Sequence, residues 1–235
     1  MYQVGVRPSF STGFAQWPGM SEYPQLWTGL LGAWDMTLGQ TGTKLFDWSG
    51  KGNHGVFVNT PTWVSSPIGP CVLMNDANDR YIAVPHNSNL NPSGDLTVVV
   101  SFASTDTAQY AGIIGKYVAN DEYVINFGSS PGAIRYAVDG TTFQTTTTWN
   151  DGQIHQAVIT RKGVVGTIYV DGKVEASNGA VNANPITNTV DLWIGGWTAG
   201  TGYILDGTIH YAMVYNRALS ASEQLLHYQL RKRMA

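Results

Sequence analysis

The sequence predicts an all-β protein, an antiparallel two-sheet β-sandwich (jelly roll) with an irregular N-terminal arm and a short C-terminal helix. Charged residues make up only 12% of the 235 residues and glycine occurs 27 times, a composition typical of turns and polar strand faces. Short segments of strand length alternate with turn dipeptides along most of the chain. No helical period precedes Ser220, and no repeat of about 20 to 50 residues indicates a propeller or a solenoid.

Three parts are expected: an arm over residues 1–29, a sandwich over 30–219 and a helical segment over 220–235. The arm has no regular period and places large aromatic residues between prolines and glycines. Because each such ring can bury about 150 to 250 Å², we expect the arm to pack on its own domain or on a partner. The anchoring candidates are Phe10, Phe14, Trp17, Tyr23 and Trp27.

The strands of the central part follow from segments rich in β-branched and aromatic residues. In chain order they are predicted at residues 81–84, 96–102, 112–116, 123–127, 133–138, 155–160, 167–170 and 192–195. Dipeptides that tolerate the positive φ of hairpin turns separate many of them, which predicts mostly antiparallel sheets. These dipeptides are Asp139-Gly140, Asp151-Gly152, Asp171-Gly172, Asn178-Gly179 and Asp206-Gly207.

The last strand, predicted over residues 209–215, is followed by the start of a helix. Ser220 and Glu223 have the spacing of a capping box, in which each side chain accepts a hydrogen bond from the other residue's amide. Alternation places Tyr211 and Met213 on one face of this strand and His210 on the other. Both faces are therefore expected to be covered.

Charge and cysteine content exclude several classes of protein. A net charge of -3 gives no electrostatic reason to expect a nucleic acid partner. Cys71 is the single cysteine, so neither an intrachain disulfide nor a thiolate metal cluster is expected. The first residues lack the pattern of a signal peptide, and no apolar run approaches the about 18 residues of a membrane span. We expect a protein that is not exported by a signal peptide and does not enter a membrane.

Acidic residues do not have the spacing that glycoside cleavage needs. A catalytic pair on one strand requires acids at alternating positions, and none of the four glutamates has an acid two residues away. Asp121 and Glu122 are adjacent and would point to opposite faces of a strand. Asp76 and Asp79 lie in a turn-forming run, where such side chains bond their own backbone.

Other catalytic motifs are absent as well, including a nucleophile elbow, a phosphate-binding loop and a zinc-protease helix. His54 lies in a turn, where packing or hydrogen bonding is the favoured role over that of a base or ligand. The sequence therefore predicts no catalytic residue and no enzymatic activity.

Seven segments in order resemble the laminin G-like, concanavalin A-like jelly roll. Its most specific parts are DWSGKGNHG (47–55), YVDGK (169–173) and VYNRALSASE (214–223). The full set comprises residues 29–57, 75–85, 96–102, 113–116, 155–176, 192–196 and 206–224. The resemblance implies two antiparallel sheets, one of them concave, with a groove that relatives use for glycans or proteins.

A finer resemblance concerns EYPQLWTGLLGAWDMTLGQTG at residues 22–42, which is similar to the start of laminin G-like domains encoded among bacteriophage structural genes. It implies a virion surface protein made in the host cytoplasm, where a single cysteine and no export signal fit. The aromatic arm would then bind other virion subunits or a second copy of the chain.

A structural Ca²⁺ is a further implication of the family resemblance, with Asp47 as the matching early ligand. Relatives carry Gly-x-Ile-Asp on the closing strand, whereas this chain has Gly207-Thr208-Ile209-His210. Imidazole is a poor Ca²⁺ ligand, so this departure speaks against the ion. Capping of the turn at residues 49–52 is the favoured role of Asp47, and no other cofactor is expected.

Glycan binding needs aromatic faces for the apolar face of a sugar and polar side chains for its hydroxyls. The candidates are Trp193, Trp197 and Tyr203, with Tyr123, Tyr136 and Trp149 as neighbours. The same residues could instead pack against the arm or a neighbouring subunit.

The predicted function is a non-enzymatic structural or adhesion module, a phage decoration or tail-associated protein that binds either neighbouring virion subunits through its arm or glycans through its groove and loops. The alternatives are a free lectin-like carbohydrate-binding module and a glycan-cleaving enzyme whose acids meet only in the fold.

Overall fold

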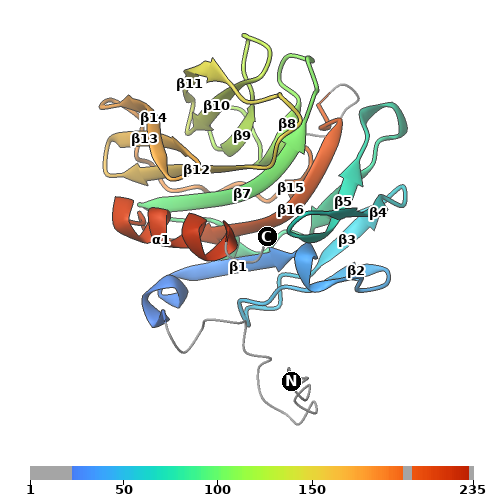
Figure 1. Cartoon of the computed structure of the whole chain (residues 1–235). Coiled ribbons are helices and arrows are strands. Elements are labelled where there is room, and N and C mark those ends of the chain that lie inside the picture. Colours follow the sequence, from blue (N-terminus) through green and yellow to red (C-terminus); the bar gives the residue numbers. More distant parts are fainter. Residues whose placement is uncertain (1–22, 198–202, 233–235) are drawn as a thin grey trace, which may run out of the picture.

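The computed structural model describes residues 23–197 and 203–232, and within them the chain forms a sandwich of two eight-stranded sheets (Figure 1). In sheet A the strand order is β14-β13-β12-β7-β16-β5-β4, with β1 pairing on β16. In sheet B the order is β11-β10-β9-β8-β15-β6-β3-β2. All strand pairs of both sheets are antiparallel, which confirms the predicted fold class.

The strand bounds are as follows. Sheet A contains β1 (Leu30–Asp35), β4 (Thr62–Ser66), β5 (Gly69–Met74), β7 (Leu96–Ser104), β12 (His155–Lys162), β13 (Val165–Val170), β14 (Lys173–Asn178) and β16 (Gly207–Tyr215). Sheet B contains β2 (Lys44–Leu45), β3 (Gly55–Val58), β6 (Tyr81–Val84), β8 (Gly112–Lys116), β9 (Tyr123–Phe127), β10 (Ala133–Val138), β11 (Thr141–Thr148) and β15 (Leu192–Ile194). The predicted bounds of β6, β8, β9 and β10 are confirmed to the residue.

Two of the five turn dipeptides form hairpins. Asp139-Gly140 joins β10 to β11 and Asp171-Gly172 joins β13 to β14, each with positive φ at both residues. The prediction is wrong for the other three. Asp151-Gly152 precedes β12, Asn178-Gly179 leads out of β14, and Gly207 begins β16 without a positive φ. Turn propensity marks where chain direction can change, and strand pairing decides whether a hairpin forms there.

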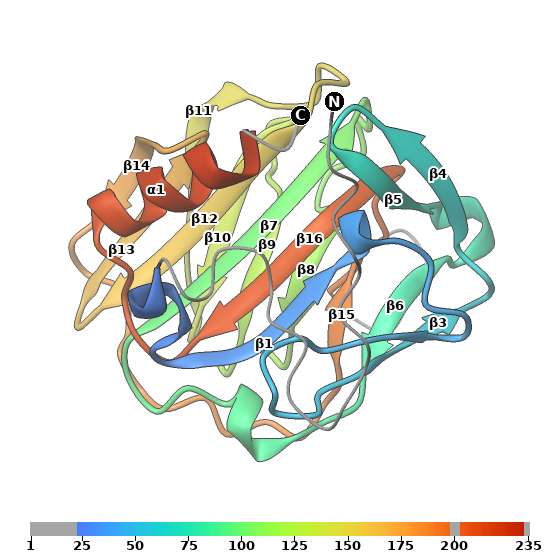
Figure 2. The ribbon, with the colours of Figure 1, turned by 60° about the horizontal axis from the view of Figure 1, so that its bottom comes forward.

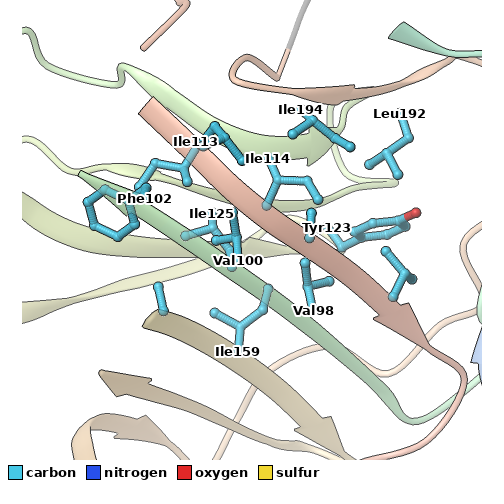
Figure 3. Close-up of a cluster of buried hydrophobic side chains, with 14 of the residues drawn as sticks. Val98, Val100, Phe102, Ile113, Ile114, Tyr123, Ile125, Ile159, Leu192 and Ile194 are labelled. Atoms are coloured by element: carbon cyan, nitrogen blue, oxygen red, sulfur yellow. The ribbon is translucent and has the colours of Figure 1, made fainter. Parts of the chain in front are cut away.

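The main core lies between the sheets, where alternate residues of facing strands meet. Figure 3 shows part of it, with Val98, Val100 and Phe102 of β7 opposite side chains of β8, β9 and β15. These aliphatic and aromatic side chains are fully buried, and their removal from water stabilises the sandwich by about 25 cal/mol per Å² of apolar surface.

A smaller cluster covers the outer face of sheet A beneath α1 (Ala221–Lys232), which lies across β12 and β13 (Figure 2). The predicted capping box begins this helix: the Ser220 amide donates to Glu223 Oε2 at 2.8 Å, and the Glu223 amide donates to Ser220 Oγ at 3.3 Å. Tyr211 and Met213 of β16 face this cluster while Val214 faces the main core, so both faces of the closing strand are covered as predicted.

Short 3-10 helices link several strands: η1 (Pro24–Trp27), η2 (Met36–Leu38), η3 (Asp76–Asn78) and η4 (Ser88–Leu90). Among the described residues, no helix is both long and apolar enough to cross a membrane.

Candidate functional site

An aromatic surface forms on the outer face of sheet B, starting from Tyr81 on β6 and Trp193 on β15. Their strand neighbours Ile82 and Ile194 point into the main core, so alternation directs both aromatic side chains outward. The two rings stack with centroids 3.9 Å apart and an angle of 22° between their planes. Both residues are half-buried, which leaves part of the stack open to solvent.

Trp197 continues this surface because β8 has no side chains where the indole lies. Gly112 and Gly115 face outward, and a Cβ added at Gly115 would lie 2.7 Å from the Cβ of Trp197. A Cβ at Gly112 would overlap the indole ring itself. The indole Nε1 donates to the Tyr110 carbonyl at 2.7 Å, which fixes the orientation of the ring.

Tyr117 and Tyr203 complete the surface around Trp197. Tyr117 meets the indole edge-to-face at 4.5 Å between ring centroids, and Tyr203 meets it at 5.0 Å. Tyr203 is 37% exposed. We call this set the aromatic belt; it consists of Tyr81, Tyr110, Tyr117, Trp193, Trp197 and Tyr203.

Polar side chains lie on the same sheet face beside the belt. Arg135 of β10 is held 5.5 Å from the Tyr110 ring centroid and donates to Asn126 Oδ1 at 3.3 Å. Burial lowers the pKa of the Arg135 guanidinium, and burial likewise raises the pKa of the Glu122 carboxyl. Glu122 Oε1 accepts from the Gly140 amide at 3.1 Å. Glu122 Oε2 and Asn126 Nδ2 are buried without a hydrogen-bond partner among the described residues.

The structure brings Trp193, Trp197 and Tyr203 together as one surface. The prediction that Tyr123 and Tyr136 belong to this surface is wrong, because both are fully buried in the main core and no ligand can touch them there. Tyr123 uses its hydroxyl to donate to the Leu90 carbonyl at 2.9 Å. Burial raises the phenol pKa of both tyrosines far above the usual range.

Trp149 is a second correction. It follows β11 at the far edge of sheet B, packs edge-on against His155 at 5.0 Å between centroids, and rests against the main core. The sequence interpretation missed Tyr81, Tyr110 and Tyr117. A signal existed for Tyr81, which alternates with Ile82 in its predicted strand, whereas Tyr110 and Tyr117 lie in loops beside β8 with no periodic pattern.

Asp47, the Ca²⁺ candidate, is occupied by protein donors. Its Oδ1 accepts from the amides of Ala33 and Ser49, and its Oδ2 accepts from Ser49 Oγ and the Asn53 amide, all within 2.9 Å. This is the turn-capping role that the sequence favoured. The described residues hold no group of three or more His, Cys, Asp or Glu side chains that could bind a metal ion. His54 accepts from the Asp47 amide at 3.0 Å and packs on Phe46, a structural role as predicted.

The end of the aromatic arm packs on its own domain. Trp27 lies against the outer cluster of sheet A, and Arg217 donates to the Thr28 carbonyl at 2.7 Å and to the Gln25 carbonyl at 2.6 Å. Tyr23 precedes η1 as its N-cap residue. The other predicted anchors, Phe10, Phe14 and Trp17, lie outside the described residues.

Two antiparallel sheets with one aromatic outer face define the chain as a jelly-roll β-sandwich domain. The family model of the concanavalin A-like lectin/glucanases superfamily matches residues 76–223, and the chain belongs to this superfamily. A comparison with curated proteins finds no matching relative.

Solved structures with the same fold come from several kinds of protein. The binding domain of Paraclostridial Mosquitocidal Protein 1 has a TM-score of 0.67 and 17% identity over 87% of this chain and 52% of its own. Trypanosoma rangeli sialidase with 2,3-difluorosialic acid has a TM-score of 0.66 and 16% identity over 88% of this chain and 34% of its own.

Domain 4 of AbnA, a GH43 extracellular arabinanase from Geobacillus stearothermophilus, in complex with arabinotriose, has a TM-score of 0.66 and 12% identity. That match covers 83% of this chain and 96% of the domain. This chain thus spans about half of the mosquitocidal binding domain and about a third of the sialidase. At these identities the likeness shows the fold alone.

Proposed function

We propose that the chain is a non-enzymatic carbohydrate-binding module that holds glycans on the aromatic belt. The observation that carries the proposal is the stacked pair of Tyr81 and Trp193, half-buried on the outer face of sheet B beside Trp197. An aromatic face packs well against the apolar C–H face of a sugar ring, and nearby polar groups can bond its hydroxyls. The match to a lectin/glucanase family supports this role.

The rigidity of the belt also supports a binding role. Trp197 is fixed by its hydrogen bond to Tyr110 and by the glycines beneath it, and Arg135 is fixed between Tyr110 and Asn126. A surface already held in its bound shape loses little conformational entropy on binding.

The positions of the carboxylates support the absence of catalysis. Glu122 is a buried acid, and its neighbour across the strand pair, Asp139, uses one carboxylate oxygen to accept from the Asn184 amide at 2.9 Å. Glu122 itself is bonded by the Gly140 amide. A retaining or inverting glycosidase needs two carboxyl groups facing the scissile bond. Burial raises the pKa of the Tyr81 phenol and the nearby carboxylates of Asp191 and Asp79 add to that rise, but Asp191 Oδ1 already accepts from the His86 amide at 2.8 Å.

Binding is tested with a glycan array, followed by calorimetry on the best ligand with Tyr81→Ala and Trp193→Ala. Each variant is expected to raise the dissociation constant about tenfold, which is a loss of about 1.4 kcal/mol of binding free energy, because a stacking face is lost. Tyr169→Ala is the matched control, since Tyr169 is a half-buried tyrosine on the outer face of sheet A. Equal loss in all three variants would count against the belt.

A reducing-sugar release assay over mixed polysaccharides tests for catalysis, and release would refute the non-enzymatic proposal.

We further propose that the module is carried on the surface of a phage particle, bound to other virion subunits through its aromatic arm. The resemblance of residues 22–42 to phage-encoded domains supports this placement. Mass spectrometry of purified particles should find the chain at a fixed ratio to the major capsid or tail protein. A free lectin would be absent from washed particles.

A further inference from the structure

A hollow lies along β5, β7 and β16 of sheet A, whereas the aromatic belt lies on sheet B. It consists of two adjoining cavities of about 640 and 410 Å³ that share Gly152. Figure 2 shows α1 on one side of β7 and β16 and the β4–β5 hairpin on the other. We call the two cavities together the sheet A trough.

The trough is open because the outward residues at this end of the sheet are small. Ala103 of β7 and Thr208 of β16 alternate with Phe102 and Ile209, which point into the main core. Further along the same strands the outward residues are larger, as with Tyr211, and the outer cluster covers them. A floor of small side chains between two raised walls therefore remains.

The polar wall of the larger cavity is held in place before any ligand arrives. Asp206 Oδ1 accepts from Asn75 Nδ2 and from the Asp76 amide, both at 2.9 Å. Ser104 Oγ donates to the Asp206 carbonyl at 2.6 Å. These bonds fix a carboxylate, an amide and a hydroxyl along one side of the cavity.

Arg80 lines the same cavity, and its guanidinium has donors that make no short hydrogen bond among the described residues. Its Nε is buried and meets no acceptor among the described residues, and its Nη1 contact to Thr62 Oγ1 is long, at 3.5 Å. No ion pair joins Arg80 to Asp206 within that part of the chain. A guanidinium with spare donors and a carboxylate thus face one cavity separately. The Nη groups of Arg80 are not enclosed by protein, so they can donate to a ligand that accepts hydrogen bonds.

The smaller cavity is lined by both apolar and polar residues. Pro67 and Ile68 form the turn of the β4–β5 hairpin on one side, and Ile154 and Tyr228 lie on the other. His155 is bonded to two carboxylates there, so it brings little uncompensated positive charge. With Arg80 and Asp206 of opposite sign in the larger cavity, the trough favours a ligand without net charge.

We propose that the sheet A trough is a second binding site, for a short neutral oligosaccharide. Sugar hydroxyls both donate and accept, so one chain can bond the guanidinium, the carboxylate and the amide, while its C–H faces lie on the apolar lining residues. The volumes fall within the range of about 300 to 1,000 Å³ usual for ligand sites. This site does not depend on the belt, because it is built mainly on strands of sheet A.

The test is a titration followed by amide chemical shifts in ¹⁵N-labelled protein, with maltotriose, cellotriose, chitotriose and arabinotriose as probes. At least one should shift the amides of Asn75, Ser104 and Thr208. Thr105→Trp fills the larger cavity from an exposed loop position that lines it and should weaken this binding at least about tenfold. Thr107→Trp, two residues along the same exposed loop, is the matched control and should leave it unchanged.

The outcomes separate the two proposals. Shifts confined to the belt, or a Thr105→Trp variant that binds as well as Thr107→Trp, overturn the trough and leave the belt standing. Loss of all binding in Trp193→Ala does the same. Trough shifts that persist in Trp193→Ala and vanish in Thr105→Trp support the second site. If no probe shifts the trough amides but a synthetic peptide of residues 1–22 does, the site takes polypeptide and the proposal fails.

Discussion

At the residue scale, two histidines titrate in opposite directions because of what surrounds them. His155 lies between Asp171 Oδ2 at 2.9 Å and Asp151 Oδ1 at 3.0 Å. Burial lowers its pKa, but the two hydrogen-bonded carboxylates outweigh that effect and the pKa is raised. His210 is fully buried at a bulge in β16, and burial lowers its pKa to about 4 against the opposing influence of the Ser101 backbone and Asp35.

The raised pKa of His155 gives stability that is fully present below the unfolded-state pKa of about 6.5 and is lost as pH rises through the folded value. Asp171→Asn keeps an acceptor for the Gln156 amide while removing the negative charge. When unfolding in urea is measured between about pH 6 and 8.5, the free energy of unfolding of Asp171→Asn should fall less with rising pH than that of the parent protein. Asp95→Asn, an acid-to-amide change in another turn, is the control. An unchanged slope in Asp171→Asn would refute this assignment.

The lowered pKa of His210 has the opposite sign. Its contribution is fully present above about pH 6.5 and is lost as pH falls toward about 4, by about 3 kcal/mol in total, since the unfolded chain takes up the proton first. His210→Gln removes the titration. The free energy of unfolding of this variant should therefore decline less between those pH values than that of the parent protein, whatever its stability at neutral pH.

At the element scale, β8 matters for function through the side chains that it lacks. Gly112 and Gly115 leave the outer surface of the strand bare, and Trp197 occupies that space between Tyr117 and Tyr203. The strand therefore contributes to the candidate site without supplying a contact of its own. Helix α1 has a different role, since it covers the outer cluster of sheet A and forms one wall of the trough.

Gly115→Ala should displace Trp197, because the added Cβ would lie 2.7 Å from the Cβ of Trp197 and 3.0 Å from Val124. We expect glycan affinity to fall about tenfold while the circular dichroism spectrum stays that of the parent. Gly94→Ala is the matched control, because no atom lies within 4 Å of its new Cβ. Normal affinity in Gly115→Ala would show that the position of Trp197 is unimportant for binding.

Ser220→Ala removes the capping box at the start of α1 and should lower the free energy of unfolding by about 1 kcal/mol. Ser222→Ala, inside the first turn of the same helix, should cost less because the Glu223 amide keeps its acceptor. Urea denaturation of the three proteins gives the comparison.

At the scale of the whole molecule, the two sheets share one core and cannot fold apart. β16 pairs with β7, β5 and β1, and it supplies side chains to both the main core and the outer cluster. We propose two surfaces for recognition, the belt on sheet B and the trough on sheet A. A domain with both proposed sites can bridge two glycan chains.

This shared core predicts a single cooperative unfolding transition for residues 23–232. Tryptophan fluorescence and far-ultraviolet circular dichroism should give coincident midpoints in urea. A glycan that binds the folded state should raise the stability by about 2.7 kcal/mol at a hundredfold excess over its dissociation constant. Separate transitions for the two probes would contradict a single core.

Local sequence was sufficient for the strands, for two hairpin turns and for the capping box, because each depends on residues within a few positions of one another. It could also have separated core from surface aromatics. Tyr123 shares its strand face with Ile125, and Tyr136 shares its face with Ile134. These apolar neighbours indicate that both tyrosines belong to the core. Trp193 has Asp191 and Gly195 on its face, which marked it as outward.

The assembled belt and trough were decided only by tertiary structure. The stack of Tyr81 on Trp193 requires the pairing of β6 with β15, strands more than a hundred residues apart in the chain. The trough requires Arg80 and Asp206 to face one cavity across a similar separation. The sequence by itself determined the class of fold and the type of each element, since alternation and capping are local. Pairing register and the space between distant side chains depend on how the whole sandwich assembles. The positions of the belt and the trough follow from these two features of the tertiary structure.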